Sequence, residues 1–186
     1  MMNYYDSTNS IIDELSKSLN NINDEEVVNL FNEIQKADKV FFVGVGRVLL
    51  SLKSVAKRLA HLGVKTYIVG QVTEPAITKD DLLIVGSGSG ESAFPLTIAK
   101  KAKQYGANVA HIGANKECSM QTYSDVFIKI PVSTKLQLPQ EISSVQPMTS
   151  LFEQSLLLLG DTLALMMVKD QNIDMTELWE HHANLE

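Results

Sequence analysis

The chain has 186 residues, of which 45% are hydrophobic and 20% charged, and its formal net charge is −6. This length fits a single domain, and this composition excludes disorder over most of the chain. The acidic balance argues against nucleic acid as a partner, and the single cysteine, Cys118, excludes an internal disulfide and a cysteine-based zinc site.

Targeting and membrane segments are not expected from the sequence. No basic segment followed by an apolar stretch and a cleavage site opens the chain. The longest apolar stretches are interrupted by Arg47 or Asp161, so that none reaches the roughly 20 residues of a membrane span. We therefore expect a cytoplasmic protein with no membrane contact.

Helices and short apolar runs alternate along the chain. Five runs predict strands: Lys39–Val43, Lys65–Val69, Asp81–Val85, Asn108–Ile112 and Asp125–Ile130. The first four are almost continuously apolar, which is typical of parallel strands covered on both faces. Helical patterns occupy Asp6–Leu19, Asp24–Ala37, Leu49–Leu62, Pro95–Tyr105, Leu151–Val168 and Asp174–His181. This alternation predicts an open, doubly wound α/β sheet.

Two connections depart from the helix–strand alternation. Residues 70–80 are too few for a full crossover helix, and a loop or a single turn is expected there. Residues 134–150, which include Pro139 and Pro147, are expected to form a long loop. Loops of this length in compact domains are often functional.

A glycine- and serine-rich loop, GSGSGES at residues 86–92, directly follows the third strand and precedes a helix. Ligands of open parallel sheets bind at the carboxyl ends of strands, and a helix start offers free N–H groups to an anion. Glycines allow a concave nest of N–H groups, and the serines add hydroxyl donors. The pattern predicts a site for the terminal phosphate of a small molecule; the alternative is a flexible turn. The residues concerned are Ser87, Gly88, Ser89, Gly90, Glu91 and Ser92.

A second glycine-containing loop, GVGRVL at residues 44–49, follows the first strand. It begins like a dinucleotide fingerprint, but Leu49 stands where the third glycine belongs, which disfavours a nucleotide-binding redox enzyme. The sheet edge should place this loop beside residues 86–92. Arg47 could then contact a phosphate or sugar oxygen, or it could be a solvated arginine at a helix start.

Glu153 is the leading candidate for a general base, because it stands at the start of the long helix after the proline-bearing loop. The competing interpretation is a capping box formed by Ser150 and Glu153. His61 and His182 are acid candidates, although the helix dipole alone would favour His61 at a helix end and His182 could be a tail residue. His111, inside a strand, is interpreted as a satisfied buried histidine. The four histidines lack the spacing of metal ligands.

Several segments together resemble the 3-hexulose-6-phosphate isomerases, a group within the wider sugar isomerase (SIS) domain family. They are residues 86–92, KRLAHLG at 57–63, DDLLI at 80–84, PMTSLFE at 147–153 and HANL at 182–185. The serine loop is common to the wider family, whereas the HLG, LFE and HANL segments make the narrower match. The resemblance extends from about residue 11 to residue 186, and the whole chain is expected to be one SIS domain, with a helical arm over 6–37, a sheet core over 39–130 and C-terminal helices over 151–181.

The resemblance implies a flavodoxin-like, three-layer α/β/α sandwich with a five-stranded parallel sheet, assembled as a homo-tetramer. It also implies interconversion of 3-hexulose 6-phosphate and fructose 6-phosphate without metal or redox cofactor, after a hexulose-phosphate synthase has fixed formaldehyde onto ribulose 5-phosphate. Residues 87–92 match the phosphate loop, Arg47 a substrate contact and Glu153 the base. His61 and His182 match histidines near the active site that a neighbouring subunit could supply.

Departures from the family pattern leave the exact sugar open. Val48 follows Arg47 where the family usually has serine, GQVTEPA at 70–76 replaces GETTTPA, and Thr149 replaces a glycine. The alternatives are another aldose–ketose phosphate isomerase on the same scaffold and a non-catalytic sugar-phosphate sensor. A transcriptional sensor would usually carry a DNA-binding domain, and the sequence shows none.

Overall fold

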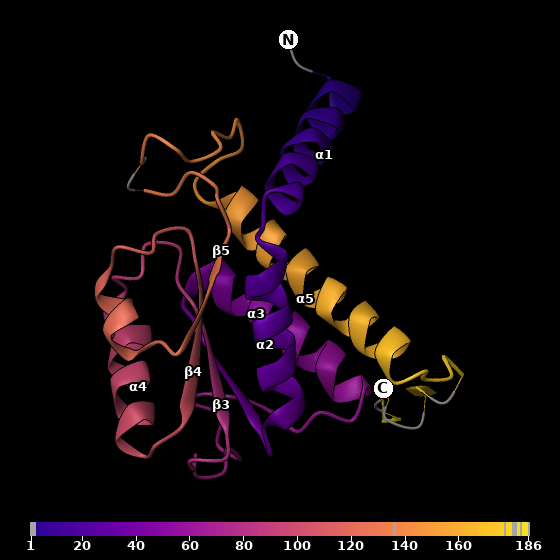
Figure 1. The fold of residues 1–186 in the computed structure, drawn as a ribbon. Helices are drawn as coiled ribbons and strands as arrows, with labels where there is room; N and C mark the ends of the chain where they lie inside the picture. Colours follow the sequence, from indigo (N-terminus) through magenta and orange to yellow (C-terminus); the bar gives the residue numbers. More distant parts are fainter. Residues whose placement is uncertain (1–2, 136, 177, 180–181, 183, 186) are drawn as a thin grey trace.

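The computed structural model describes all residues except 1–2, 136, 177, 180–181, 183 and 186 (Figure 1). Its elements, in chain order, are α1 (Tyr4–Asn20), α2 (Asp24–Lys36), β1 (Val40–Val43), α3 (Gly46–His61), β2 (Thr66–Ile68), β3 (Leu82–Gly86), α4 (Ala93–Gln104), β4 (Asn108–Gly113), the 3₁₀ helix η1 (Ser119–Tyr123), β5 (Val126–Lys129) and α5 (Ser150–Asp170).

The five strands form one parallel sheet in the order β2-β1-β3-β4-β5. This confirms the predicted five-stranded parallel sheet, and it is the strand order of flavodoxin-like folds. Every position of β1 and β3 is buried, as their continuous apolar runs predicted. The chain reverses its direction of winding between β1 and β3, and such a switch point opens a crevice at the carboxyl ends of those strands.

Helices cover the two faces of the sheet unequally (Figure 1). On one face α2, α3 and α5 enclose the larger part of the core, which includes Phe42, Leu52, Ile84 and Phe152. On the other face α4 and η1 cover a smaller cluster around Val85 and Met120. The result is the expected α/β/α sandwich, with α5 packed on α3 and α1 packed on α5.

α1 projects beyond the body of the molecule in Figure 1, while its C-terminal half is fastened to α5. The buried hydroxyls of Ser18 and Ser155 lie 2.8 Å apart across this contact. Glu14, also buried, accepts hydrogen bonds from Ser144, Val145 and Gln146 in the loop before α5. The first helix therefore anchors the loop that leads to residue 153.

α5 has the length and composition of a membrane-spanning helix, with a mean hydropathy of 1.5 over 18 residues, contrary to the expectation that no segment would reach that length. In the structure 56% of that window is buried inside the protein. Packing against α1 and α3 accounts for its apolar character, since a helix that is apolar nearly all round is usually buried.

Several predicted boundaries were wrong by two or three residues. α1 begins at Tyr4 because Asn3 caps it in a reciprocal box with Asp6. α3 begins at Gly46, three residues before its predicted start at Leu49, and α4 begins at Ala93, two residues before its predicted start at Pro95. The loops at 70–80 and 134–149 are present. The helix expected at 174–181 falls partly on residues outside those described.

Candidate active site

A polar cleft lies at the carboxyl edge of the sheet, between the loop after β1 and the serine loop after β3. Its volume is about 270 Å³, and its lining comes from residues 45–48, 86–89 with 92, 134–135, 149 and 152–153. The two glycine-containing loops therefore meet as the sequence predicted. Arg47, five residues of the serine loop and Glu153 all contribute to this one cleft.

Internal hydrogen bonds hold the serine loop in a defined turn. The hydroxyl of Ser87 accepts from the N–H of Gly90 at 3.2 Å, and that of Ser89 accepts from the N–H of Glu91 at 3.3 Å. The backbone N–H groups of Gly88, Ser89 and Ser92 donate no hydrogen bond to any of the described residues. The loop thus brings unpaired donors together at the start of α4, where the helix dipole favours an anion.

Two members of the predicted phosphate loop do not line the cleft. Gly90 has a φ of +70°, and a Cβ there would lie 2.2 Å from the sulfur of Cys118. The Glu91 carboxylate accepts a hydrogen bond from the N–H of Ser119 at 2.7 Å, and hydrogen bonds from Ser119 lower the pKa of this carboxyl group. Gly90 and Glu91 therefore stabilise the conformation of the loop through contacts with residues 118 and 119, outside the cleft.

Arg47 and Glu153, 106 residues apart in the sequence, form an ion pair on the wall of the cleft, in which Nε of Arg47 donates to Oε2 of Glu153. The second carboxylate oxygen, Oε1, accepts from the hydroxyl of Thr149 at 3.0 Å. The Glu153 side chain is only 7% exposed, whereas that of Arg47 is 65% exposed. A carboxylate fixed at both oxygens is positioned for proton transfer.

The capping-box interpretation of Glu153 was wrong. Thr149, rather than Ser150, is the N-cap of α5, and no side chain in the described part of the chain caps the helix there. Ser150 has entered the first helical turn, and its hydroxyl donates to the carbonyl of Pro147 at 2.8 Å. Oε1 of Glu153 bonds the Thr149 hydroxyl instead of a backbone N–H, so the carboxylate remains at the cleft.

The structure places His61 and His182 together, but away from Glu153 of the same chain. Their rings stack with centroids 5.2 Å apart, and Trp179 lies against His182 at the same distance. His61 is the last residue of α3 and Arg47 is its second, so that 14 helical steps separate them by roughly 21 Å. His61 borders a different hollow, of about 410 Å³, together with Lys53, Lys57, Arg58 and Asp161.

Sequence reasoning missed four residues of the cleft: Thr134, Lys135, Thr149 and Phe152. All belong to, or directly follow, the long loop that was singled out as functional without naming its residues. The loop leaves β5 at the same edge of the sheet as the serine loop, which was the available indication. Lys135 adds a second cation to the lining beside Arg47.

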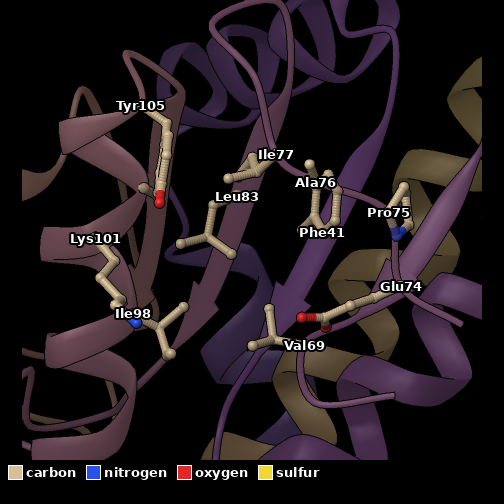
Figure 2. Close-up of a pocket in the computed structure, with 11 residues that line it drawn as sticks. Phe41, Val69, Glu74, Pro75, Ala76, Ile77, Leu83, Ile98, Lys101 and Tyr105 are labelled. Atoms are coloured by element: carbon tan, nitrogen blue, oxygen red, sulfur yellow. The ribbon is translucent and has the colours of Figure 1, made fainter. Parts of the chain in front are cut away.

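An apolar pocket of similar size to the cleft, about 300 Å³, lies over the face of the sheet that α4 covers (Figure 2). Phe41 and Leu83 form its floor. Ile98 and Lys101 of α4 and Tyr105, which follows the helix, line one side, and residues 74–77 line the other. None of the candidate catalytic or substrate-binding residues named from the sequence lines it. Across the described ranges, no three His, Cys, Asp or Glu side chains gather as they would for a metal ion.

The SIS domain model matches residues 33–158, and the chain belongs to the SIS domain family. Within that family, it is 39% identical over 95% of both chains to the 3-hexulose-6-phosphate isomerase of Bacillus subtilis. It is 34% identical to the enzyme of the same name from Mycobacterium gastri, over 94% of this chain and 87% of that one.

A solved structure extends the same comparison. The crystal structure of a Methanococcus jannaschii protein, for which a molecular function of 3-hexulose-6-phosphate isomerase was inferred, superposes with a TM-score of 0.82 at 34% identity, covering 97% of this chain and 99% of that one. The resemblance noted in the sequence is thereby confirmed at the level of family and fold.

Proposed function

We propose that this protein is a sugar-phosphate isomerase that interconverts 3-hexulose 6-phosphate and fructose 6-phosphate by proton transfer through a cis-enediol. The observation that carries the proposal is a buried carboxylate, held by Arg47 and Thr149, in the same cleft as the unpaired N–H groups of the serine loop. Relatives named for this reaction, aligned over nearly the whole chain, support the choice of sugar.

The serine loop binds the 6-phosphate in this account. Backbone N–H groups of Gly88, Ser89 and Ser92 and the start of α4 supply the donors, and Lys135 supplies positive charge at the cleft. Local donors of this kind explain how a chain with a net charge of −6 can hold an anion. The serine hydroxyls fix the turn, and Ser92 marks its passage into the helix.

Glu153 then acts as the base that moves the proton between carbons. It removes the proton from C2 of the open-chain 3-ketose and returns it to C3, so that the carbonyl moves from C3 to C2. Arg47 holds the carboxylate and contacts the substrate oxygens, since its side chain remains largely exposed. These steps require neither electron transfer nor a metal.

His61 and His182 exchange protons with O2 and O3 from a neighbouring copy of the chain. The roughly 21 Å of helix between His61 and Arg47 supports this assignment, because one chain cannot bring both residues to the same substrate. The protein accordingly works as a homo-oligomer, a tetramer by family resemblance. In the cytoplasm it consumes the product of a hexulose-phosphate synthase, which joins formaldehyde to ribulose 5-phosphate.

A substrate panel tests the proposal. The wild-type protein is incubated with 3-hexulose 6-phosphate, and fructose 6-phosphate is followed through a coupled reduction of NADP. Ribulose 5-phosphate and arabinose 5-phosphate serve as comparison substrates, and their conversion is followed by proton NMR because the coupled assay detects only fructose 6-phosphate. We expect turnover of the 3-hexulose 6-phosphate alone. Turnover of another sugar phosphate, or binding of fructose 6-phosphate without turnover, would contradict the proposal.

A further inference from the structure

His111 lies in the middle of β4 with no exposed surface, and its ring contacts the serine loop from behind. Nε2 of the ring lies 2.9 Å from the backbone carbonyl oxygen of Ser87. The sequence predicted a buried histidine with satisfied hydrogen bonds, and both ring nitrogens of His111 have a partner. Its partner is the backbone of the loop that borders the cleft.

The two neighbours of the ring determine which nitrogen carries the proton. A carbonyl oxygen only accepts, so Nε2 donates to Ser87. The side-chain amide nitrogen of Gln121 lies 3.2 Å from Nδ1 and only donates, so Nδ1 accepts. Burial lowers the pKa of His111 to about 4, which agrees with a neutral ring. Gln121, on η1, thus holds the ring in the form that can donate to the loop.

Glycines make room for this contact on two sides. A Cβ at Gly113 would lie 2.5 Å from Nε2 of His111 and 2.9 Å from the Ser87 carbonyl oxygen. A Cβ at Gly90 would lie 3.3 Å from Cε1 of the ring. Any side chain at Gly113 would therefore displace the hydrogen bond between the ring and the loop.

The bonded carbonyl belongs to the turn that carries the unpaired N–H groups. The same Ser87 oxygen accepts from the N–H of Gly90 at 3.1 Å, and the Gly90 carbonyl accepts from the N–H of Met120 at 3.2 Å. Between these two fixed points lie Gly88 and Ser89. Their donors can face an anion only while the turn keeps its shape.

We propose that His111, oriented by Gln121, is a positioning residue that holds the serine loop in its anion-binding conformation through the Nε2–H bond to Ser87. The inference rests on the proposed function, since it assumes that the loop binds the phosphate of the substrate. His111 itself is not among the residues that line the cleft.

The test compares three variants of the full chain in the binding of inorganic phosphate and of fructose 6-phosphate by calorimetry, and in turnover. His111→Leu removes the donor, and His111→Gln keeps an N–H near the position of Nε2. Val109→Ala alters the same strand and the same sheet face without touching the loop, and controls for general destabilisation.

We expect His111→Leu to raise both dissociation constants and the Michaelis constant about tenfold, the size of one hydrogen bond that shapes a site, with kcat changed by less than about threefold. His111→Gln should recover most of the affinity, and Val109→Ala should bind like the wild type. Unchanged affinity in His111→Leu, or an equal loss in Val109→Ala, would overturn the inference.

If His111→Leu does not fold, the tautomer of His111 in the wild type provides a second test. Long-range proton–nitrogen correlation spectra at pH 7 should show His111 as the Nε2–H tautomer, and the Nδ1–H form would overturn the inference. If the wild type binds neither inorganic phosphate nor fructose 6-phosphate, the proposed function is contradicted as well. Wild-type binding of phosphate without turnover of any sugar would remove the proposed reaction alone.

Discussion

Two hollows of this molecule, the polar cleft and the apolar pocket, are alike in size and opposite in chemistry. Their volumes are about 270 Å³ and 300 Å³. The cleft contains unpaired backbone donors and the Arg47–Glu153 pair, whereas Phe41, Leu83 and Ile98 dominate the pocket in Figure 2. The contrast teaches that convergent polar groups, rather than volume, identify the site.

Topology explains the difference. The cleft lies where the strand order switches between β1 and β3, so that two loops and a helix start point their backbone groups into it. The pocket lies over the middle of the same two strands, where residues 70–80 cross the sheet as a loop instead of a helix. Its lining is core surface that no helix covers.

The largest effect is expected from removing the carboxylate of the cleft. Glu153→Gln keeps the size of the side chain but not its basicity, and should lower kcat at least ~100-fold, the usual size of a general-base contribution. Steady-state kinetics with 3-hexulose 6-phosphate provide the measurement. Glu74→Gln, which changes a carboxylate at the apolar pocket, is the matched control and should retain activity. Equal losses of kcat in the two variants would contradict the assignment of catalysis to the cleft.

A smaller effect is expected from the serine hydroxyls that fix the loop. Ser87→Ala combined with Ser89→Ala removes the acceptors for two loop N–H groups, and should raise the Michaelis constant about tenfold with a smaller change in kcat. Ser10→Ala, which alters a partly exposed serine of α1 remote from the cleft lining, is the control. An unchanged Michaelis constant in the double variant would count against the loop as the phosphate site.

The next test concerns the attachment of the loop that leads to Glu153. Burial alone would raise the pKa of Glu14, but hydrogen bonds from Ser144, Val145 and Gln146 and the charge of Lys17 outweigh it and hold the pKa below 4.5. A depressed pKa in the folded state stabilises the protein above pH 4.5, and this contribution is lost as the pH falls through the folded value.

Glu14→Gln should accordingly lower the free energy of unfolding by about 1 kcal/mol at pH 7, and by progressively less below pH 4.5. Urea unfolding at pH 7, 5 and 4 measures the difference. Asp13→Asn, which changes an exposed neighbour on α1, should show no such dependence. A difference that stays constant from pH 7 to pH 4 would argue against the anchoring role of the Glu14 carboxylate.

The smallest effect is expected at the apolar pocket itself. Lys101→Gln and Tyr105→Phe change its polar rim, and each should leave kcat and the Michaelis constant within about twofold of the wild type, as for surface substitutions remote from a site. The same assay provides the measurement. A tenfold loss in either variant would show that the apolar pocket takes part in the reaction.

The sequence was sufficient for the sheet and for the serine loop, because continuous apolar runs and a Gly/Ser segment after a strand are local features. Helix starts were less predictable: Asn3 extends α1 by two residues through a cap that lies outside the apolar pattern. α3 begins directly at Gly46, whereas the apolar pattern suggested Leu49.

The remaining features of the site depend on contacts between distant segments. The motif around Ser150 matches a capping box in sequence, but the long loop brings Thr149 into the cap position. The Glu153 carboxylate therefore pairs with Arg47 instead of capping the helix. The partner of His111 depends on how deeply the ring lies beneath the serine loop, which strand periodicity does not encode. The separation of His61 from the cleft follows only once α3 is seen as one uninterrupted helix.

Hydrogen exchange in the substrate tests most directly whether the cleft carboxylate moves the proton. Fructose 6-phosphate is incubated with the protein in D₂O and followed by proton NMR, because each abstraction allows the carboxyl proton to exchange with the solvent. We predict that the wild type replaces the hydrogen at C3 with deuterium and that Glu153→Gln does so at least ~100-fold more slowly. Deuterium entering C1 instead of C3, or exchange at C3 that is as fast in Glu153→Gln as in the wild type, would contradict the account.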